Sequence, residues 1–157
     1  AAARLGLVKT TSYGGGGPMC LGGRALQFRA AGERAAGPLV PRADLCGPVG
    51  ADGSFRMQAA PLLLDLAERG RRAPAEAAYR FHREVAAAAL AGALRGGEMT
   101  GLRCICLSGG VFQNQLLVEL LVPGLQGAGF TVHTHRQLPP GDGGLAVGQV
   151  YFLPETG

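Results

Sequence analysis

A chain of 157 residues, 47% of them hydrophobic, is long enough for one domain with a modest core and apolar enough to fold. Its net charge of +4 comes almost wholly from scattered arginines, which argues against a nucleic-acid-binding face. No apolar run approaches the roughly 18 residues of a membrane helix, and the chain does not open with a secretory signal pattern. We therefore expect a cytoplasmic protein that binds neither nucleic acid nor membrane.

The four cysteines are Cys20, Cys46, Cys104 and Cys106, and no pair has the two-residue gap of a zinc knuckle or redox motif. We expect no structural zinc site. Cys104 and Cys106 stand two apart in an apolar run, so in a strand they would share one face. That placement favours two small buried hydrophobic residues over a pair of metal ligands.

Residues 1–58 are rich in turn-forming residues and show neither a sustained helical period nor strand alternation. We interpret them as an irregular segment rich in Gly, Arg and Ala. The glycine run from Gly14 to Gly17 lacks the preceding strand and the following Lys-Ser/Thr of a phosphate-binding P-loop. A flexible loop is the expected structure there.

Two helices are predicted next. Pro61 suits a first helical turn and Gly70 is placed to end a short helix. A longer helix starts at Pro74 and carries apolar and small residues at three- and four-residue spacing, and Gly96 and Gly97 are expected to stop it. Its narrow, Ala-rich stripe predicts close packing against a sheet or another helix.

The rest of the chain predicts a strand, a helix, a strand and a helix. Residues 102–107 form a short apolar run, and the helical pattern that follows the glycine turn at 108–110 continues until Gly127 and Gly129. Residues 130–133 are the second expected strand, and a loop over 138–144 precedes a last helix through about Phe152. The fold class is therefore α/β.

Two glycine-rich turns follow the two strands, Ser108-Gly109-Gly110 and Gly141 to Gly144. Such turns let backbone N–H groups and a positive helix end approach a phosphate or another anion. In a parallel sheet both turns would lie at the carboxyl ends of the strands, where ligands bind in open α/β folds. This placement indicates a nucleotide cleft.

Several polar residues near these turns have two interpretations. Asp142 would cap the last helix or bind a metal ion, and the residues alone favour the cap. Asn114 would be an exposed polar residue in the first turn of its helix or a ligand-binding residue. His135 is a candidate neighbour of the site, His133 would share its face, and His82, beside the apolar stripe of the long helix, is expected to be structural.

The motifs resemble a known family. Residues 107–114 (LSGGVFQN), Gly129-Phe130, His135 and residues 138–149 (LPPGDGGLAVGQ) are similar, in order and spacing, to the C-terminus of HypF-type carbamoyltransferases. Upstream, residues 77–82 (AAYRFH) and the segment at 60–63 (APLL) also resemble that family. The resemblance covers roughly residues 52–153 and makes residues 59–157 the C-terminal part of a carbamoyltransferase domain.

The resemblance implies a partial domain of the actin/sugar-kinase-like (ASKHA) class, related to the enzymes that make threonylcarbamoyladenosine in transfer RNA. In HypF-type proteins carbamoyl phosphate and ATP yield carbamoyl-adenylate. This domain passes the carbamoyl group to the C-terminal cysteine of a HypE-type partner during maturation of nickel-iron hydrogenase. The residues implied to bind the adenylate or phosphate are Ser108, Gly109, Gly110, Asn114 and Gly143. Asp142 would be one ligand of a divalent metal ion, whether zinc, iron or magnesium, which reverses the cap-first interpretation.

The chain also departs from the family. The family's His-x-x-x-His pair and its upstream modules are absent, so we expect a truncated protein or fragment, inactive alone. Thr10 to Tyr13 resembles a family segment that the following stretch does not continue, and we hypothesise that residues 14 to about 50 are out of frame. The alternatives are a nucleotide-binding half-module, a structural remnant, and a fragment of an antibiotic O-carbamoyltransferase.

Overall fold

The computed structural model describes residues 1–3, 5, 7, 16–30 and 37–151. Its helices in those residues are α1 (Gly16–Ala30), α2 (Ala60–Arg69), α3 (Pro74–Thr100), α4 (Gln115–Gly127) and α5 (Leu145–Tyr151). Its strands there are β1 (Cys104–Leu107) and β2 (Thr131–Thr134). Single turns of 3-10 helix cover Ala43–Leu45, Gly110–Gln113 and Asp142–Gly144. No helix among the described residues has both the length and the apolar character needed to cross a membrane.

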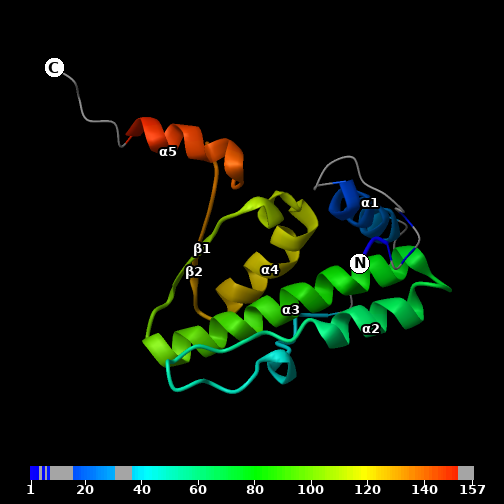
Figure 1. Cartoon of the computed structure of the whole chain (residues 1–157), viewed down its shortest axis with the longest axis horizontal. Coiled ribbons are helices and arrows are strands. Elements are labelled where there is room, and N and C mark those ends of the chain that lie inside the picture. The colour runs from blue at the N-terminus through cyan, green and yellow to red at the C-terminus, as the bar shows by residue number, and fades with distance from the viewer. Residues whose placement is uncertain (4, 6, 8–15, 31–36, 152–157) are drawn as a thin grey trace.

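The long helix α3 is the centre of the molecule, and α1, α2 and α4 all pack against it (Figure 1). Pro74 opens the helix at a position where its missing N–H is not needed. Small side chains on α3, including Ala78, Ala86 and Ala91, are buried. These alanines let neighbouring helices approach closely, as the Ala-rich stripe predicted.

The prediction that Gly96 and Gly97 stop this helix is wrong. The helix continues to Thr100 and ends where Gly101 adopts a left-handed conformation with φ 73°. Gly97 is needed for packing, since a Cβ there would lie 2.9 Å from Cζ of Phe130. Gly97 therefore lets α3 pack closely against Phe130, which directly precedes β2.

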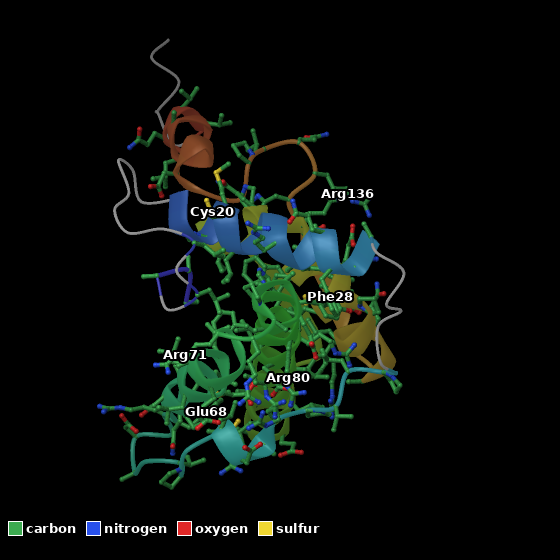
Figure 2. The ribbon with its side chains drawn as sticks, turned by 90° about the vertical axis from the view of Figure 1, so that its right-hand side faces the viewer. Cys20, Phe28, Glu68, Arg71, Arg80 and Arg136 are labelled. Atoms are coloured by element: carbon green, nitrogen blue, oxygen red, sulfur yellow. The ribbon has the colours of Figure 1, made fainter. Side chains whose placement is uncertain are left out.

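Helix α1 lies within the segment expected to be irregular, so that expectation is wrong for residues 16–30. The helix is stabilised by burial of Leu21 and Ala25 against Ala78 and Tyr79 of α3. Phe28 points to the same contact, and its ring centroid lies 5.6 Å from that of Tyr79 (Figure 2). Tertiary packing here overrides a weak local pattern.

The first part of the glycine run and the Thr10–Tyr13 segment lie outside the described residues. Gly16 and Gly17 form the first turn of α1, which differs from the flexible loop expected there. The predicted end of the last helix at Phe152 also lies outside the described residues, and α5 is seen as far as Tyr151.

Strands β1 and β2 pair in parallel, with Cys104 opposite Thr131 and Leu107 opposite Thr134. Helix α4 connects them and covers one face of the sheet. The core beneath that face includes Leu107, Leu117, Leu121, Leu125 and Phe130. This strand, helix, strand and helix order after a set of helices is the predicted α/β architecture.

The prediction that Cys104 and Cys106 are buried is wrong, because both are exposed. The two residues do share one face of β1, while Ile105 and Leu107 point to the core. A two-stranded sheet that helices cover on one side leaves the other side open to solvent. Side chains of β1 therefore alternate between the two faces of the sheet, as predicted, but the cysteines lie on the uncovered face.

Candidate functional site

The turn after β1 consists of Ser108, Gly109 and Gly110. Gly109 has φ 97° and ψ 160°, a backbone conformation that is essentially restricted to glycine. Gly110 then begins the 3-10 turn that leads into α4. A Cβ built on Gly109 or Gly110 would meet no atom within 4 Å, so open space lies in front of this turn.

The second glycine turn packs directly on the first. The backbone N–H of Gly109 donates to the carbonyl oxygen of Pro140 over 2.7 Å. A Cβ on Gly141 would lie 2.7 Å from Nε2 of Gln113 and 3.4 Å from Cα of Gly110. The structure thus brings together the two turns that the sequence placed at the carboxyl ends of the strands, and glycine at position 141 permits their contact.

Of the two glycines that the resemblance assigned to this edge, Gly110 has an available backbone donor and Gly109 does not. Gly109 uses its N–H to bind Pro140. Among the described residues, the backbone N–H groups of Gly110 and Val111 have no acceptor. Val111, 60% exposed, was missed by sequence reasoning because its apolar side chain gave no sign that its backbone is available. Its place in the first turn after a glycine pair is the signal that would have found it.

Asn114 is the N-cap of α4. Its Oδ1 accepts a hydrogen bond from the backbone N–H of Leu117 over 3.2 Å. Its Nδ2 lies 2.8 Å from Nε2 of His82. Both ends of this amide are therefore bound within the protein, so Asn114 has a structural role whether or not it also contacts a ligand.

His82 is a satisfied buried residue, as the sequence predicted. Its exposed fraction is 5%, and its Nδ1 lies 2.8 Å from the carbonyl oxygen of Ala78, one turn earlier in α3. Burial lowers the pKa of the imidazole below the ordinary histidine value, and the hydrogen bond to the Ala78 carbonyl opposes this effect. The ring is consequently neutral near pH 7.

His135 reaches Ser108 across the ends of the two strands. Its Nε2 lies 3.0 Å from Oγ of Ser108, which places His135 beside the first glycine turn. An open hollow of about 570 Å³ runs along residues 132–138 next to this pair. His133 lies opposite Cys106 on the uncovered face of the sheet. The exposed polar groups therefore gather at the carboxyl ends of the strands.

Asp142 opens the 3-10 turn before α5, and its side chain is exposed. Within the described part of the chain its carboxylate makes no hydrogen bond or ion pair, so the capping bond that the residues alone favoured is not formed. The described residues also contain no group of three or more His, Cys, Asp or Glu side chains that would hold a metal ion. One free carboxylate does not fit a complete metal site.

Gly143 and Gly144 follow Asp142 where the loop folds over Pro139. A Cβ on Gly143 would lie 3.0 Å from Cγ of Pro139, and one on Gly144 would lie 2.9 Å from the Pro139 carbonyl oxygen. Side chains at either position would push this loop away from the first turn. These glycines therefore shape the site by close packing within their own loop.

The fold defines the class of protein. Over 94% of this chain, the backbone matches a crystal structure of full-length HypF in the phosphate- and nucleotide-bound form, with a TM-score of 0.74 and 24% identity. A crystal structure of T. kodakarensis HypF matches over 96% of the chain with a TM-score of 0.65 and 24% identity. The chain therefore has the fold of the matching part of these HypF structures.

The family is defined by sequence comparison. A family model described as Carbamoyltransferase, Kae1-like Domain, second subdomain, matches residues 1–149, and the chain belongs to this HypF carbamoyltransferase family. Carbamoyltransferase HypF2 of Cupriavidus necator is 43% identical over 77 residues, which are 49% of this chain and 10% of that protein. Carbamoyltransferase HypF of Rhizobium leguminosarum bv. viciae is 36% identical over 96 residues, 61% of this chain and 13% of the relative.

The chain spans only a small part of its relatives. It covers 10% and 13% of these two curated proteins and 18% of each of the two solved chains. The matched range also includes residues 14–50, for which the sequence suggested an altered reading frame. The activity, substrates and partners of a whole HypF-type protein are therefore proposals for this chain.

Proposed function

We propose that this chain forms one wall of the carbamoyl-adenylate site of a cytoplasmic HypF-type carbamoyltransferase. The observation that carries the proposal is the hydrogen bond from Gly109 to Pro140, which joins two glycine turns at the carboxyl edge of a parallel sheet. Ligands of open α/β folds bind at this edge. A solved relative of the same fold is described as phosphate- and nucleotide-bound, which supports a nucleotide as the ligand.

The anion would be held by the backbone of the first turn. The N–H groups of Gly110 and Val111 have no acceptor in the described part of the chain, and the N-terminus of the 13-residue helix α4 follows them. Amides in this arrangement can donate to a phosphate oxygen, and no hydrogen bond within the described chain has to break first. The hydroxyl of Ser108, oriented by His135, would add a side-chain hydrogen bond. Gly143, by packing on Pro139, would keep the loop after β2 close to the first turn.

The proposed reaction takes its nucleophile from a partner. A thiolate, the C-terminal cysteine of a HypE-type protein, attacks the carbamoyl carbon of carbamoyl-adenylate. A carbon–sulfur bond forms, the bond to the adenylate phosphate oxygen breaks, and AMP leaves. Carbamoyl phosphate and ATP supply the adenylate in the complete protein. This chain would bind and orient the adenylate, with no covalent role for its own side chains.

Asp142 stays a candidate ligand for a divalent metal ion such as zinc, iron or magnesium. In the described residues it is an exposed carboxylate that belongs to no group of three or more His, Cys, Asp or Glu side chains. The remaining ligands would have to come from outside those residues. We therefore assign no step of the reaction to a metal ion and expect the chain to be inactive alone.

A complementation experiment tests this function. The chain is mixed with an N-terminal HypF fragment that lacks this region, together with ATP, carbamoyl phosphate and a HypE-type protein, and the acceptor is followed by intact mass. The proposal predicts carbamoylated acceptor with the mixture and none with either piece alone. An unmodified acceptor, with both pieces folded and bound to each other, would contradict it and favour a structural remnant.

A further inference from the structure

His82 and Asn114 meet where three helices converge. His82 belongs to α3, and Asn114 caps α4. Helix α1 covers the contact, since a Cβ on Gly22 would lie 3.7 Å from Nδ2 of Asn114. The imidazole is buried, so its hydrogen bonds are formed away from bulk water. A polar contact in such a place is costly to leave unmade.

The partners of this contact fix its direction. The carbonyl of Ala78 can only accept a hydrogen bond, so His82 must carry its proton on Nδ1. In the neutral ring Nε2 is then an acceptor, and the group 2.8 Å away must be the amide nitrogen of Asn114. That orientation turns the Asn114 oxygen towards the Leu117 N–H, which it caps over 3.2 Å. Each bond in this series determines the next.

We infer that His82 is a positioning residue that sets the orientation of the Asn114 amide and, through it, the start of α4 and the end of the glycine turn. The backbone links the two, because the N–H of Asn114 also donates to the carbonyl of Val111 over 3.2 Å. Val111 carries one of the two amides of the turn that have no acceptor among the described residues. The consequence for nucleotide binding rests on the proposed function, whereas the consequence for the cap does not.

Protonation of the ring would reverse the arrangement. Cationic His82 has donors on both nitrogens, so Asn114 would have to offer its oxygen to Nε2 and its NH₂ to the Leu117 N–H, which cannot accept it. The ring has Phe81 at its side, with centroids 6.3 Å apart and planes at 89°. Burial lowers the pKa of His82, and the hydrogen bond to the Ala78 carbonyl opposes this effect.

Nuclear magnetic resonance of the full chain tests the direction of the series. We expect His82 to be the neutral Nδ1–H tautomer at pH 7. In Asn114→Asp a carboxylate would still cap α4 but would accept a hydrogen bond from the protonated Nε2 and stabilise the cationic ring, so the pKa of His82 should rise by roughly one pH unit or more. Gln115→Glu, which adds the same charge at an exposed neighbouring position, should raise it far less. An Nε2–H tautomer, or equal rises in both variants, would overturn the inference.

Amide hydrogen exchange tests the effect on the cap. In His82→Ala the Leu117 N–H should exchange roughly fivefold faster relative to core amides of α4, as expected when a cap is lost. The same substitution made in an Asn114→Ala background should add no further change at Leu117. Uniformly faster exchange throughout α3 and α4, with the same increment in both backgrounds, would mean that His82 only fills space. ATP affinity measured on these variants is a separate readout, so a wild-type chain that binds no ATP contradicts the proposed function alone.

Discussion

The carbonyl oxygen of Pro140 accepts a 2.7 Å hydrogen bond from the backbone N–H of Gly109. This single bond ties the turn after β1 to the loop after β2. The next two amides, those of Gly110 and Val111, have no acceptor among the described residues. The candidate site is therefore a backbone structure, and substitutions that change backbone conformation should affect it more than loss of any side chain.

Gly109 and Gly110 should respond differently to the same substitution. Gly109→Ala should lower the free energy of unfolding by about 1–3 kcal/mol, because φ 97° with ψ 160° is a strained conformation for alanine. Gly110 has no positive φ and open space at its Cβ position, so Gly110→Ala should change stability by less than about 0.5 kcal/mol. Urea denaturation of both variants checks this, and equal losses would contradict the described turn.

Gly96 and Gly97 form a second matched pair. Gly96→Ala should stabilise the protein by roughly 0.5–1 kcal/mol, because alanine favours a helix interior and its Cβ would meet no atom within 4 Å. Gly97→Ala should destabilise it by about 1–3 kcal/mol, because its Cβ would press on the ring of Phe130. Thermal unfolding followed by circular dichroism distinguishes them. Stabilisation by both would mean that α3 does not pack against Phe130.

The hydroxyl of Tyr79 is buried and has no hydrogen-bond partner among the described residues. A buried unsatisfied donor costs about 1–3 kcal/mol, so Tyr79→Phe should raise the free energy of unfolding by roughly 1 kcal/mol. Tyr79→Leu is the control, since it also removes the ring that lies against Phe28 and should destabilise the chain. Loss of stability in Tyr79→Phe would reveal a partner for the hydroxyl.

Stability should decrease as acidification titrates His82. The pKa of the folded imidazole lies below the unfolded value because burial disfavours the charged ring. The unfolded chain therefore binds the proton first, and stability present near pH 7 is lost as pH falls below the ordinary histidine pKa. His82→Gln should flatten this decline between about pH 7 and pH 5. Equal slopes in wild type and variant would contradict a depressed pKa.

Much of the fold could be predicted because apolar runs and glycines mark it locally. Such patterns predicted the β1 and β2 strands, α2, α4 and the structural role of His82. Helix α1 could not be predicted, since its stability comes from contacts with α3 that a local period does not reveal. The exposure of Cys104 and Cys106 also depends on which face of the sheet the rest of the chain covers.

The candidate site could be predicted in place but not in detail. Glycines after two strands indicated the carboxyl edge, and the structure joins the two turns there. Sequence reasoning assigned backbone donors to both Gly109 and Gly110. The structure uses the Gly109 N–H in the bond to Pro140, and the amides without an acceptor in the described chain belong to Gly110, as chosen from the sequence, and to Val111. The Gly109 amide is engaged because the Pro140 carbonyl lies next to it, and no residue pattern predicts that the two are close. Asp142 was singled out from the motif, and its metal-binding role stays a prediction.

Calorimetric titration of the purified chain with ATP and a divalent metal ion tests the central claim most directly. Gly110→Ala and Gly96→Ala make a matched pair, because each adds one methyl group into open space, at the proposed site and on α3 respectively. The nucleotide-site account predicts saturable binding that Gly110→Ala weakens at least about tenfold, while Gly96→Ala leaves it unchanged. No binding by the folded wild type, or binding that Gly110→Ala does not alter, would contradict it.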